Sequence, residues 1–335
     1  MDTARLSDSV ASRTILHLLD TRGFGGIESH VAALVRSQVR AGRQVILLRL
    51  TDHGPHPLAS LGLPLRVAGG VRGLLRCLTG SVLLHTHGYK AGVLGRACAR
   101  LTNTPVVSTY HAGDRGTGRV ALWTRLDEWT APPACLAVSS EIAARLPHRA
   151  LVLPPPVPLE EPQPLGPLVA FAGRLSPEKA PECFLQAVSA TGVAAALLGD
   201  GPLAGHLTIP PGVEAPGVAA MAEWWPRIGL LCLPSLAEGL PMVVLEAMAR
   251  AIPVVASAVG ELPQLLADGA AWALIPPGDS AALAAAIQRW QQASEEERRR
   301  AGARGRCRLA RYAGPESVLA RLDQVYQRAV DQCSR

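Results

Sequence analysis

A turn with two glutamates stands out in the second half of the chain, within residues 234–248 (PSLAEGLPMVVLEAM). Pro241 suits the first turn of a helix, so the segment predicts a helix that begins beside it. The backbone N–H groups of Gly239 and Leu240 would then lie unpaired at the positive end of that helix. Such an end binds anions, and we expect an anion site here.

The two glutamates have the spacing E-x7-E, which places Glu238 before this helix and Glu246 inside it. The helix is apolar on every side of Glu246, and a carboxylate there is costly unless donors bind it. Sugar or ribose hydroxyls would serve as those donors. The alternative is an ion pair with Arg250, four residues on, worth only about 0.3–0.5 kcal/mol.

A second candidate pair, Arg174 and Lys179, lies in residues 171–179 (FAGRLSPEK). Both follow the carboxyl end of a predicted strand, where open α/β sheets bind ligands. An arginine fork and a lysine point charge together would neutralise a diphosphate. The chain has 31 arginines and only two lysines, so a retained lysine favours a role that needs a compact ammonium. The alternative is two solvated loop cations.

A glycine-rich loop, residues 23–28 (GFGGIE), separates a predicted strand from a predicted helix in the first half. Glycines such as Gly25 and Gly26 let a ligand approach the backbone closely. As a dinucleotide fingerprint the loop is weak, because Glu28 takes the third glycine position and would repel a pyrophosphate, although Asp52 does end the second strand. Local turn geometry is the other alternative.

Three histidines follow predicted strands: His85 and His87 in HTHGYK, and His111 in STYHAG. At the carboxyl edge of a sheet they would hydrogen-bond a substrate. A structural role is the alternative, above all for His85 and His87. These two also suit a metal, but no third or fourth ligand lies at a sensible spacing, so we expect no metal.

Short apolar runs alternate with amphipathic helical patterns, which predicts parallel sheets covered by helices on both faces. The expected strands are 14–20, 44–50, 81–85, 105–109, 135–138, 168–172, 194–198, 230–233 and 253–256. The expected helices include 27–41, 91–101, 181–190, 241–250, 280–292 and 315–330. A proline-rich stretch predicts a stiff linker. The predicted division is a first Rossmann-like domain at 1–153, the linker at 154–167, a second such domain at 168–312 and a C-terminal helix at 313–335.

The composition excludes several classes of protein. With 335 residues, of which 48% are hydrophobic and 18% charged, the chain can build about two folded cores. No apolar run reaches the about 18 residues of a membrane span, and the first fifteen residues lack the apolar region of a signal peptide. The seven cysteines form no C-x-x-C pair, which predicts reduced thiols in a cytoplasmic protein.

Charge is distributed unevenly along the chain. Residues 1–153 hold 18 Lys and Arg against 9 Asp and Glu, whereas residues 154–335 hold 15 against 18. The basic first half favours a phosphorylated substrate or an acidic lipid surface. Aromatic residues are only 4% and no nucleic-acid module is present, so no nucleic-acid partner is expected. Residues 71–78 and 113–130 combine arginine with apolar side chains and suit an acidic membrane surface, with ordinary packing as the alternative.

Taken together, these motifs resemble the retaining glycosyltransferases of family 4. The resemblance runs in order through GGIESHVAALVRSQVRAG, HTHGYKAG, STYHAG, AVSSEIAARL, FAGRLSPEKA, LLGDGPL and PSLAEGLPMVVLEAMARAIPVVAS. It implies the GT-B fold: an α/β architecture of two tandem Rossmann-like domains with a facing cleft and a C-terminal helix that returns to the first domain. The chain departs from the family at Ala180, where glycine is common, and at Trp224 and Trp225, in a region near the nucleotide base.

The resemblance also implies catalytic roles. Arg174 and Lys179 would hold the donor diphosphate and stabilise the leaving nucleotide. Glu238 would contact hydroxyls of the transferred sugar, and His111 would lie beside that sugar. These enzymes generally need no metal, so we expect no cofactor.

The donor-binding residues implied by the resemblance are Gly25, Gly26, Gly239, Leu240 and Glu246. The first two glycines would line the phosphate and acceptor side. The backbone amides of Gly239 and Leu240 would face sugar and phosphate, and Glu246 would bind the ribose hydroxyls.

The implied function is retaining transfer of a hexose from a UDP- or GDP-sugar to a glycan, or to a polyprenyl- or other lipid-linked acceptor, in bacterial surface polysaccharide or lipopolysaccharide synthesis. Three alternatives stay open: a soluble small-molecule acceptor, a nucleotide-sugar epimerase of the same fold and, from a different class, a non-catalytic nucleotide-sugar-binding partner protein. A cytoplasmic location is expected, and peripheral contact with the inner face of the cell membrane is left open.

Overall fold

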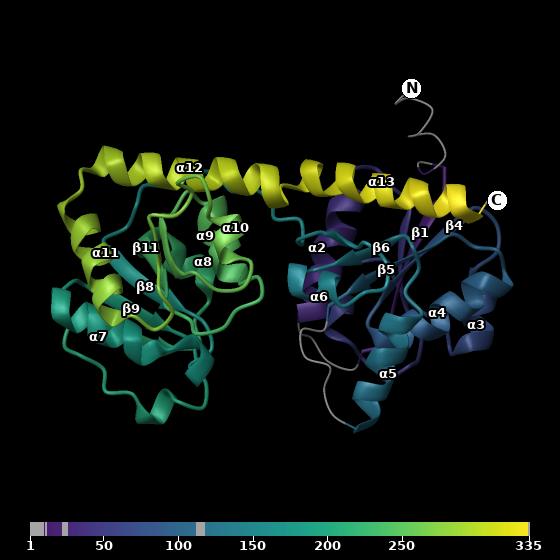
Figure 1. Ribbon diagram of the computed structural model, residues 1–335, viewed down its shortest axis with the longest axis horizontal. Helices are drawn as coiled ribbons and strands as arrows, with labels where there is room; N and C mark the ends of the chain where they lie inside the picture. Colours follow the sequence, from purple (N-terminus) through teal and green to yellow (C-terminus); the bar gives the residue numbers. More distant parts are fainter. Residues whose placement is uncertain (1–9, 11, 22–25, 112–117, 334–335) are drawn as a thin grey trace. The chain divides into compact units, whose positions relative to one another are not determined.

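The computed structural model describes residues 10, 12–21, 26–111 and 118–333. The chain divides into two compact units: unit 1 comprises Met1–Pro156 and Pro315–Arg335, and unit 2 comprises Val157–Gly314. The predicted linker, 154–167, contains neither helix nor strand, and unit 2 begins within it. Each unit is built on one parallel sheet (Figure 1).

The sheet of unit 1 has the strand order β3-β2-β1-β4-β5-β6-β7. Its winding reverses between β1 and β4, which is the switch point at which such sheets bind ligands. The central strands β1 and β4 are buried almost along their whole length because helices cover both faces of the sheet, and they carry histidines as well as apolar residues. The strands are β1 (Thr14–Leu19), β2 (Val45–Arg49), β3 (Leu65–Val67), β4 (Val82–His87), β5 (Val106–Tyr110), β6 (Cys135–Ala137) and β7 (Leu151–Val152). The helices are α2 (Gly26–Arg40), α3 (Val71–Cys77), α4 (Tyr89–Leu101), α5 (Gly118–Trp129) and α6 (Ser140–Ala144).

The C-terminal helix α13 (Pro315–Cys333) belongs to unit 1. It runs along unit 1 and contacts α2 and β5 (Figure 1). It buries one apolar stripe in the core of that unit. Tyr326, at the centre of the stripe, is fully buried. An ion pair between Arg43 and Asp323 also ties α13 to unit 1. The predicted return of the C-terminal helix to the first domain is therefore confirmed.

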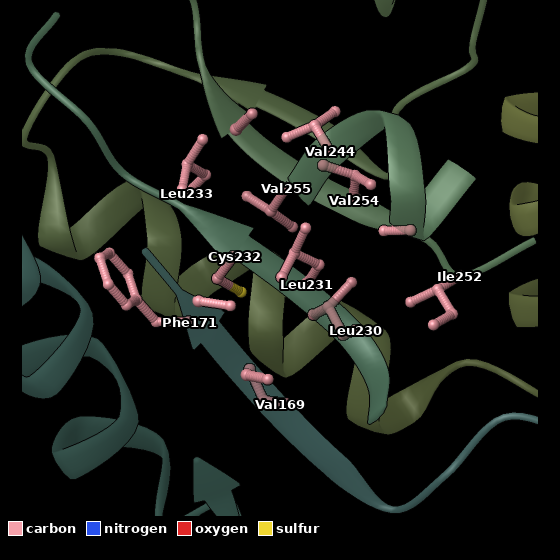
Figure 2. Close-up of a cluster of buried hydrophobic side chains, with 14 of the residues drawn as sticks. Val169, Phe171, Leu230, Leu231, Cys232, Leu233, Val244, Ile252, Val254 and Val255 are labelled. Carbon is pink, nitrogen blue, oxygen red and sulfur yellow. The ribbon is translucent and has the colours of Figure 1, made fainter. Parts of the chain in front are cut away.

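The sheet of unit 2 has the order β10-β9-β8-β11-β12-β13, with its switch point between β8 and β11. Figure 2 shows its core, where Phe171, Leu231, Val244 and Val255 meet from β8, β11, α9 and β12. The strands are β8 (Leu168–Ala172), β9 (Ala195–Leu198), β10 (Val213–Gly217), β11 (Ile228–Leu233), β12 (Val254–Ser257) and β13 (Ala273–Ile275). The helices are α7 (Pro181–Thr191), α8 (Met221–Trp224), α9 (Met242–Ala249), α10 (Leu262–Leu265), α11 (Ser280–Gln292) and α12 (Glu295–Ala313).

Two Rossmann-like units in tandem confirm the predicted fold class. The sequence did not predict β3, β7, β10 and β13, all at or beside the sheet edges.

Candidate functional site

The loops that follow β8 and β11 meet at the switch point of unit 2. The loop after β8 ends in a short 3-10 turn, η2 (Pro177–Lys179), and the backbone N–H of Leu236 donates to the carbonyl of Glu178 at 2.8 Å. This contact brings together two predicted site residues that are 59 positions apart, Lys179 and Glu238. Lys179 Nζ lies 2.6 Å from both Oε1 and Oε2 of Glu238.

The carboxylate of Glu238 is almost fully engaged. Its side chain is 4% exposed, against 24% for Lys179, and Ser235 Oγ donates to Oε1 at 2.7 Å. A carboxylate offers about four acceptor positions, of which three are filled, and an ammonium has three N–H donors, of which two are used. As far as the described residues go, the pair therefore keeps one acceptor and one donor for a ligand.

Gly260 packs against the backbone of the turn that carries Glu238 and Gly239, and the sequence did not single it out. Its φ is +55°, and a Cβ added there would lie 2.1 Å from the carbonyl oxygen of Glu238. The next residue, Glu261, donates its N–H to the carbonyl of Gly239 at 3.2 Å. Only a glycine lets these backbones approach so closely. The available signal was its position just after the predicted strand 253–256.

Glu246 lies half-buried on α9, and its carboxylate makes no hydrogen bond to a side chain within the described ranges. Burial raises the pKa of this carboxyl above its usual value, and Arg250 opposes that rise. The guanidinium of Arg250 donates to the backbone oxygen of Glu246 at 3.0 Å and lies over the ring of Trp225. Among the described residues, the side chains of Glu246 and Arg250 therefore do not form the ion pair that was the alternative role for Glu246.

The other predicted donor-site groups of unit 2 lie on the same two loops. Arg174 is exposed and has no ion pair among the residues described. The N–H groups of Gly239 and Leu240, just before α9, make no hydrogen bond within the described residues, so they are open to an anion. Ala180, at a position where glycine is common in the family that the sequence resembles, adopts φ +49°, a left-handed conformation that an L-residue adopts only at a cost. Trp225 is buried in the core of unit 2.

In unit 1, strands β1 and β4 bring three histidines together at the interior of the sheet. His17 pairs with His85 in the strand register, and the side-chain nitrogens of His17, His85 and His87 lie within 4.8 Å of one another. The sequence reasoning missed His17, because it sits inside an apolar strand. That position was itself the signal, since a polar residue on a fully buried strand needs a polar partner.

Hydrogen bonds occupy every ring nitrogen of these three histidines. His17 bonds to His87 (2.9 Å) and to Gln38 (2.7 Å), and His87 bonds on to the predicted site residue His111 (3.1 Å). His85 bonds to Tyr326 (2.8 Å) and Thr109 (2.7 Å). A metal would have to displace these bonds, so the cluster does not need one to explain its geometry.

Burial keeps this cluster neutral. It lowers the pKa of His17 and of the nearby His30 to about 4. The pKa values of His85, His87 and His111 are held well below 6.5, first by burial and then by neighbouring histidines.

The glycine loop of unit 1 is only partly described. Gly25 lies outside the described residues. Gly26 is the exposed first residue of α2, and a Cβ there would meet nothing within 4 Å. At the end of β1, Asp20, whose side chain is only 2% exposed, pairs with Lys90 and with His53.

Two family models together span most of the chain. Residues 24–161 match Glycosyltransferase Family 4, and residues 166–292 match Glycosyl transferases group 1. The chain belongs to glycosyltransferase family 4. Its two Rossmann-like units have the GT-B fold.

The individual relatives share low sequence identity with this chain or match only part of it. The D-inositol 3-phosphate glycosyltransferase of Streptomyces avermitilis is 25% identical over 307 residues, which cover 72% of this chain and 66% of that relative. The MMP alpha-(1->4)-mannosyltransferase of Mycolicibacterium hassiacum is 39% identical over 100 residues, 30% of this chain and 24% of that relative. Anabaena Alr3699/HepE, solved in complex with UDP, superposes with a TM-score of 0.74 at 17% identity over 96% of this chain and 99% of that chain.

Proposed function

We propose that this glycosyltransferase moves a hexose, with retention of configuration, from a UDP- or GDP-sugar to a hydroxyl of its acceptor. The observation that carries the proposal is the Lys179–Glu238 pair at the switch point of unit 2. The remaining N–H of Lys179 suits a phosphate oxygen, and the remaining acceptor position of Glu238 suits a sugar hydroxyl. A nucleotide sugar carries both of these groups. The UDP bound by HepE, which shares the fold, supports a nucleotide in this role.

The chemistry follows from the charges on the two loops. Departure of a nucleoside diphosphate develops negative charge, which Arg174, Lys179 and the amides of Gly239 and Leu240 are suited to stabilise. The acceptor attacks on the face of the leaving group, and the departing phosphate takes its proton. No carboxylate on the opposite face is needed, in contrast to a retaining hydrolase. Because side chains and amides supply the positive charge, the proposal includes no metal or other cofactor.

The remaining predicted residues complete the donor site in this proposal. Glu246 accepts the ribose hydroxyls, which satisfy a half-buried carboxylate that the described residues leave without a side-chain donor. His111 lies beside the transferred sugar, and Gly25 and Gly26 line the phosphate and acceptor side.

Calorimetric binding of UDP, GDP, ADP and their sugar conjugates, without metal, tests the donor site. We expect one nucleotide to bind selectively and Glu246→Gln to weaken it at least tenfold. Glu182→Gln, a matched change of an exposed glutamate on α7, should bind normally. Turnover of the bound donor then separates a transferase from an epimerase, which leaves the nucleotide attached, and from a non-catalytic partner. Equal affinity in all three proteins would overturn the site.

For the acceptor we propose a glycan or lipid-linked molecule used in surface polysaccharide or lipopolysaccharide synthesis, reached at an acidic membrane face. Helix α5 supports this. Leu122 (68% exposed), Leu126 and Trp129 (78% exposed) form one apolar stripe, and the exposed Arg119 and Arg125 flank it at helical spacing. Such a face suits an anionic lipid surface. No helix within the described ranges has the length and hydropathy needed to cross a bilayer.

Co-sedimentation with vesicles tests the membrane part. We expect binding to vesicles that contain phosphatidylglycerol, and loss of binding in Leu122→Ala/Trp129→Ala. Leu101→Ala, which removes another exposed leucine of unit 1, is the matched control. Binding that survives the double change would overturn the role of α5.

A soluble, anionic small molecule is the second acceptor candidate. The inositol phosphate in the name of the Streptomyces relative favours it, and the basic first unit suits its phosphate. Transfer to inositol phosphate in the absence of vesicles would support this candidate over the lipid-linked one.

A further inference from the structure

A continuous chain of hydrogen bonds runs through the interior of unit 1 to His111. Helix α13 supplies Tyr326 and α2 supplies Gln38, whose Nε2 donates to the Tyr326 hydroxyl at 3.0 Å. Gln38 Oε1 lies 2.7 Å from His17 Nε2. From there the chain passes through His87 to His111.

The amide of Gln38 gives this chain one direction. An amide oxygen only accepts, so the proton of neutral His17 sits on Nε2 and its Nδ1 is bare. His17 Nδ1 therefore accepts from Nε2–H of His87, whose bare Nδ1 accepts in turn from Nε2–H of His111. His111 is left with Nδ1 as a hydrogen-bond acceptor.

A second branch starts at the other end of the amide. Because the Tyr326 hydroxyl accepts from Gln38, its own proton points to Nδ1 of His85. His85 then donates from Nε2 to Thr109 Oγ1. If the Gln38 amide turned over, every proton of both branches would have to move, and His111 would present an N–H instead.

We propose that Gln38, His17 and His87 are positioning residues that fix His111 as the Nε2–H tautomer, so that its Nδ1 accepts a hydrogen bond from a hydroxyl of the bound sugar. This deepens the proposed function, on which the identity of the ligand rests. Burial keeps His17, His87 and His111 neutral, so each ring carries one proton. The position of that proton on one ring therefore determines its position on the next. The C-terminal helix takes part through a single hydroxyl, that of Tyr326.

Nitrogen-15 NMR of histidine-labelled protein tests the proposal, because the shifts of Nδ1 and Nε2 identify the tautomer. We expect wild-type His111 to be purely Nε2–H. Gln38→Met removes the amide from a similar volume, and we expect a mixture of both His111 tautomers. Tyr326→Phe should give the same mixture and is the second variant if Gln38→Met does not fold.

Two variants separate positioning from a general loss of packing. Gln38→Glu keeps an acceptor against His17 Nε2–H and should restore the single tautomer. Thr109→Val removes a buried hydrogen bond only from the His85 branch and should leave His111 unchanged. A His111 that carries its proton on Nδ1 in the wild type, or that stays purely Nε2–H in both Gln38→Met and Tyr326→Phe, would overturn the proposal.

Addition of the nucleotide sugar tests the ligand. A shift of the His111 Nδ1 resonance on saturation, absent with the bare nucleotide, is expected if a sugar hydroxyl donates to it. The sugar transfer rate of Gln38→Met should fall about tenfold while the Kd of the bare nucleotide is unchanged. A nucleotide sugar that binds without moving this resonance overturns the hydroxyl contact alone. If no nucleotide sugar binds, the proposed function has failed, whereas the tautomer measurement still decides the positioning chain.

Discussion

Lys179 donates to both carboxylate oxygens of Glu238, so the cation expected to neutralise a diphosphate is already paired. The pairing limits where the ammonium can go. In the proposed donor site, a phosphate would reach Lys179 at the N–H that Glu238 leaves unused, because the other two N–H groups hold the ammonium against the carboxylate. The other lysine of the chain, Lys90, is likewise bound to a buried carboxylate, that of Asp20.

We predict that Lys179→Met slows sugar transfer by about 10²–10³ while the Kd of the donor rises only a few-fold. The reason is that a fixed cation acts mainly on the charge that develops as the nucleotide leaves. Steady-state kinetics and calorimetry measure the two effects. Lys90→Met, which breaks the equivalent pair in unit 1, should leave the donor Kd unaltered; a loss of donor affinity as large as the loss of rate would contradict the prediction.

Donor binding should weaken in acid because of Glu246. Burial raises the pKa of this carboxyl, so it takes up a proton at a higher pH than an ordinary glutamate and then accepts fewer hydroxyl hydrogen bonds. The donor Kd should therefore rise as the pH falls toward that raised pKa, and the rise should be smaller in Glu246→Gln. Calorimetry from pH 8 to pH 5 makes the comparison.

The same raised pKa predicts a gain in stability for Glu246→Gln. The folded state binds this proton more tightly than the unfolded state, so ionised Glu246 lowers the free energy of unfolding at neutral pH. Urea unfolding at pH 7 should show a more stable variant that nonetheless binds nucleotide poorly. A less stable variant would show that Glu246 has a structural partner.

Unit 1 should lose stability in mild acid. The folded pKa of His17 is about 4, against 6.5 for a free histidine, so below pH 6.5 the unfolded state takes up a proton that the folded state refuses until about pH 4. This one group removes roughly 3 kcal/mol between pH 7 and pH 4. Urea unfolding at several pH values should show a shallower pH dependence in His17→Asn. His206→Asn, at an exposed histidine of unit 2, should keep the wild-type slope.

Gly260→Ala should disrupt the donor site from outside it. The added Cβ would have to push the carbonyl of Glu238 away from 2.1 Å, and the backbone would remain at φ +55°. We expect donor affinity to fall tenfold or more and the free energy of unfolding to fall by about 1–3 kcal/mol. Gly205→Ala is the matched control, because a Cβ there meets nothing within 4 Å and its φ is ordinary. Normal binding by Gly260→Ala would remove the turn from the donor site.

The sequence predicted the central strands because a strand buried on both faces is a continuous apolar run, as in β8 and β11. It did not predict β7, which has two residues, or β10, whose sequence VEAPG is largely exposed. Edge strands carry less apolar sequence because one side meets water. The motif residues in the loops after β8 and β11 were recognisable one by one. The pairing of Lys179 with Glu238 could not be predicted, because the two residues lie 59 positions apart in the sequence.

The histidine chain was the least predictable part. His85, His87 and His111 were identified as candidates, while His17 and Gln38 lie in segments whose periodicity is explained by packing alone. Their connection depends on strand register and on the tyrosine of a helix 241 residues beyond His85. Contacts of this range leave no local pattern.

The return of α13 also sets an order of events during synthesis. Unit 2 is one uninterrupted stretch, Val157–Gly314, whereas unit 1 needs Pro315–Arg335 to fill its core. On the ribosome residues 1–156 emerge before unit 2, yet the helix that completes their core is made only after unit 2. Unit 2 can therefore complete its fold first. A chain that stalls before α13 would expose the apolar residues of unit 1 that α13 otherwise covers to chaperones and proteases.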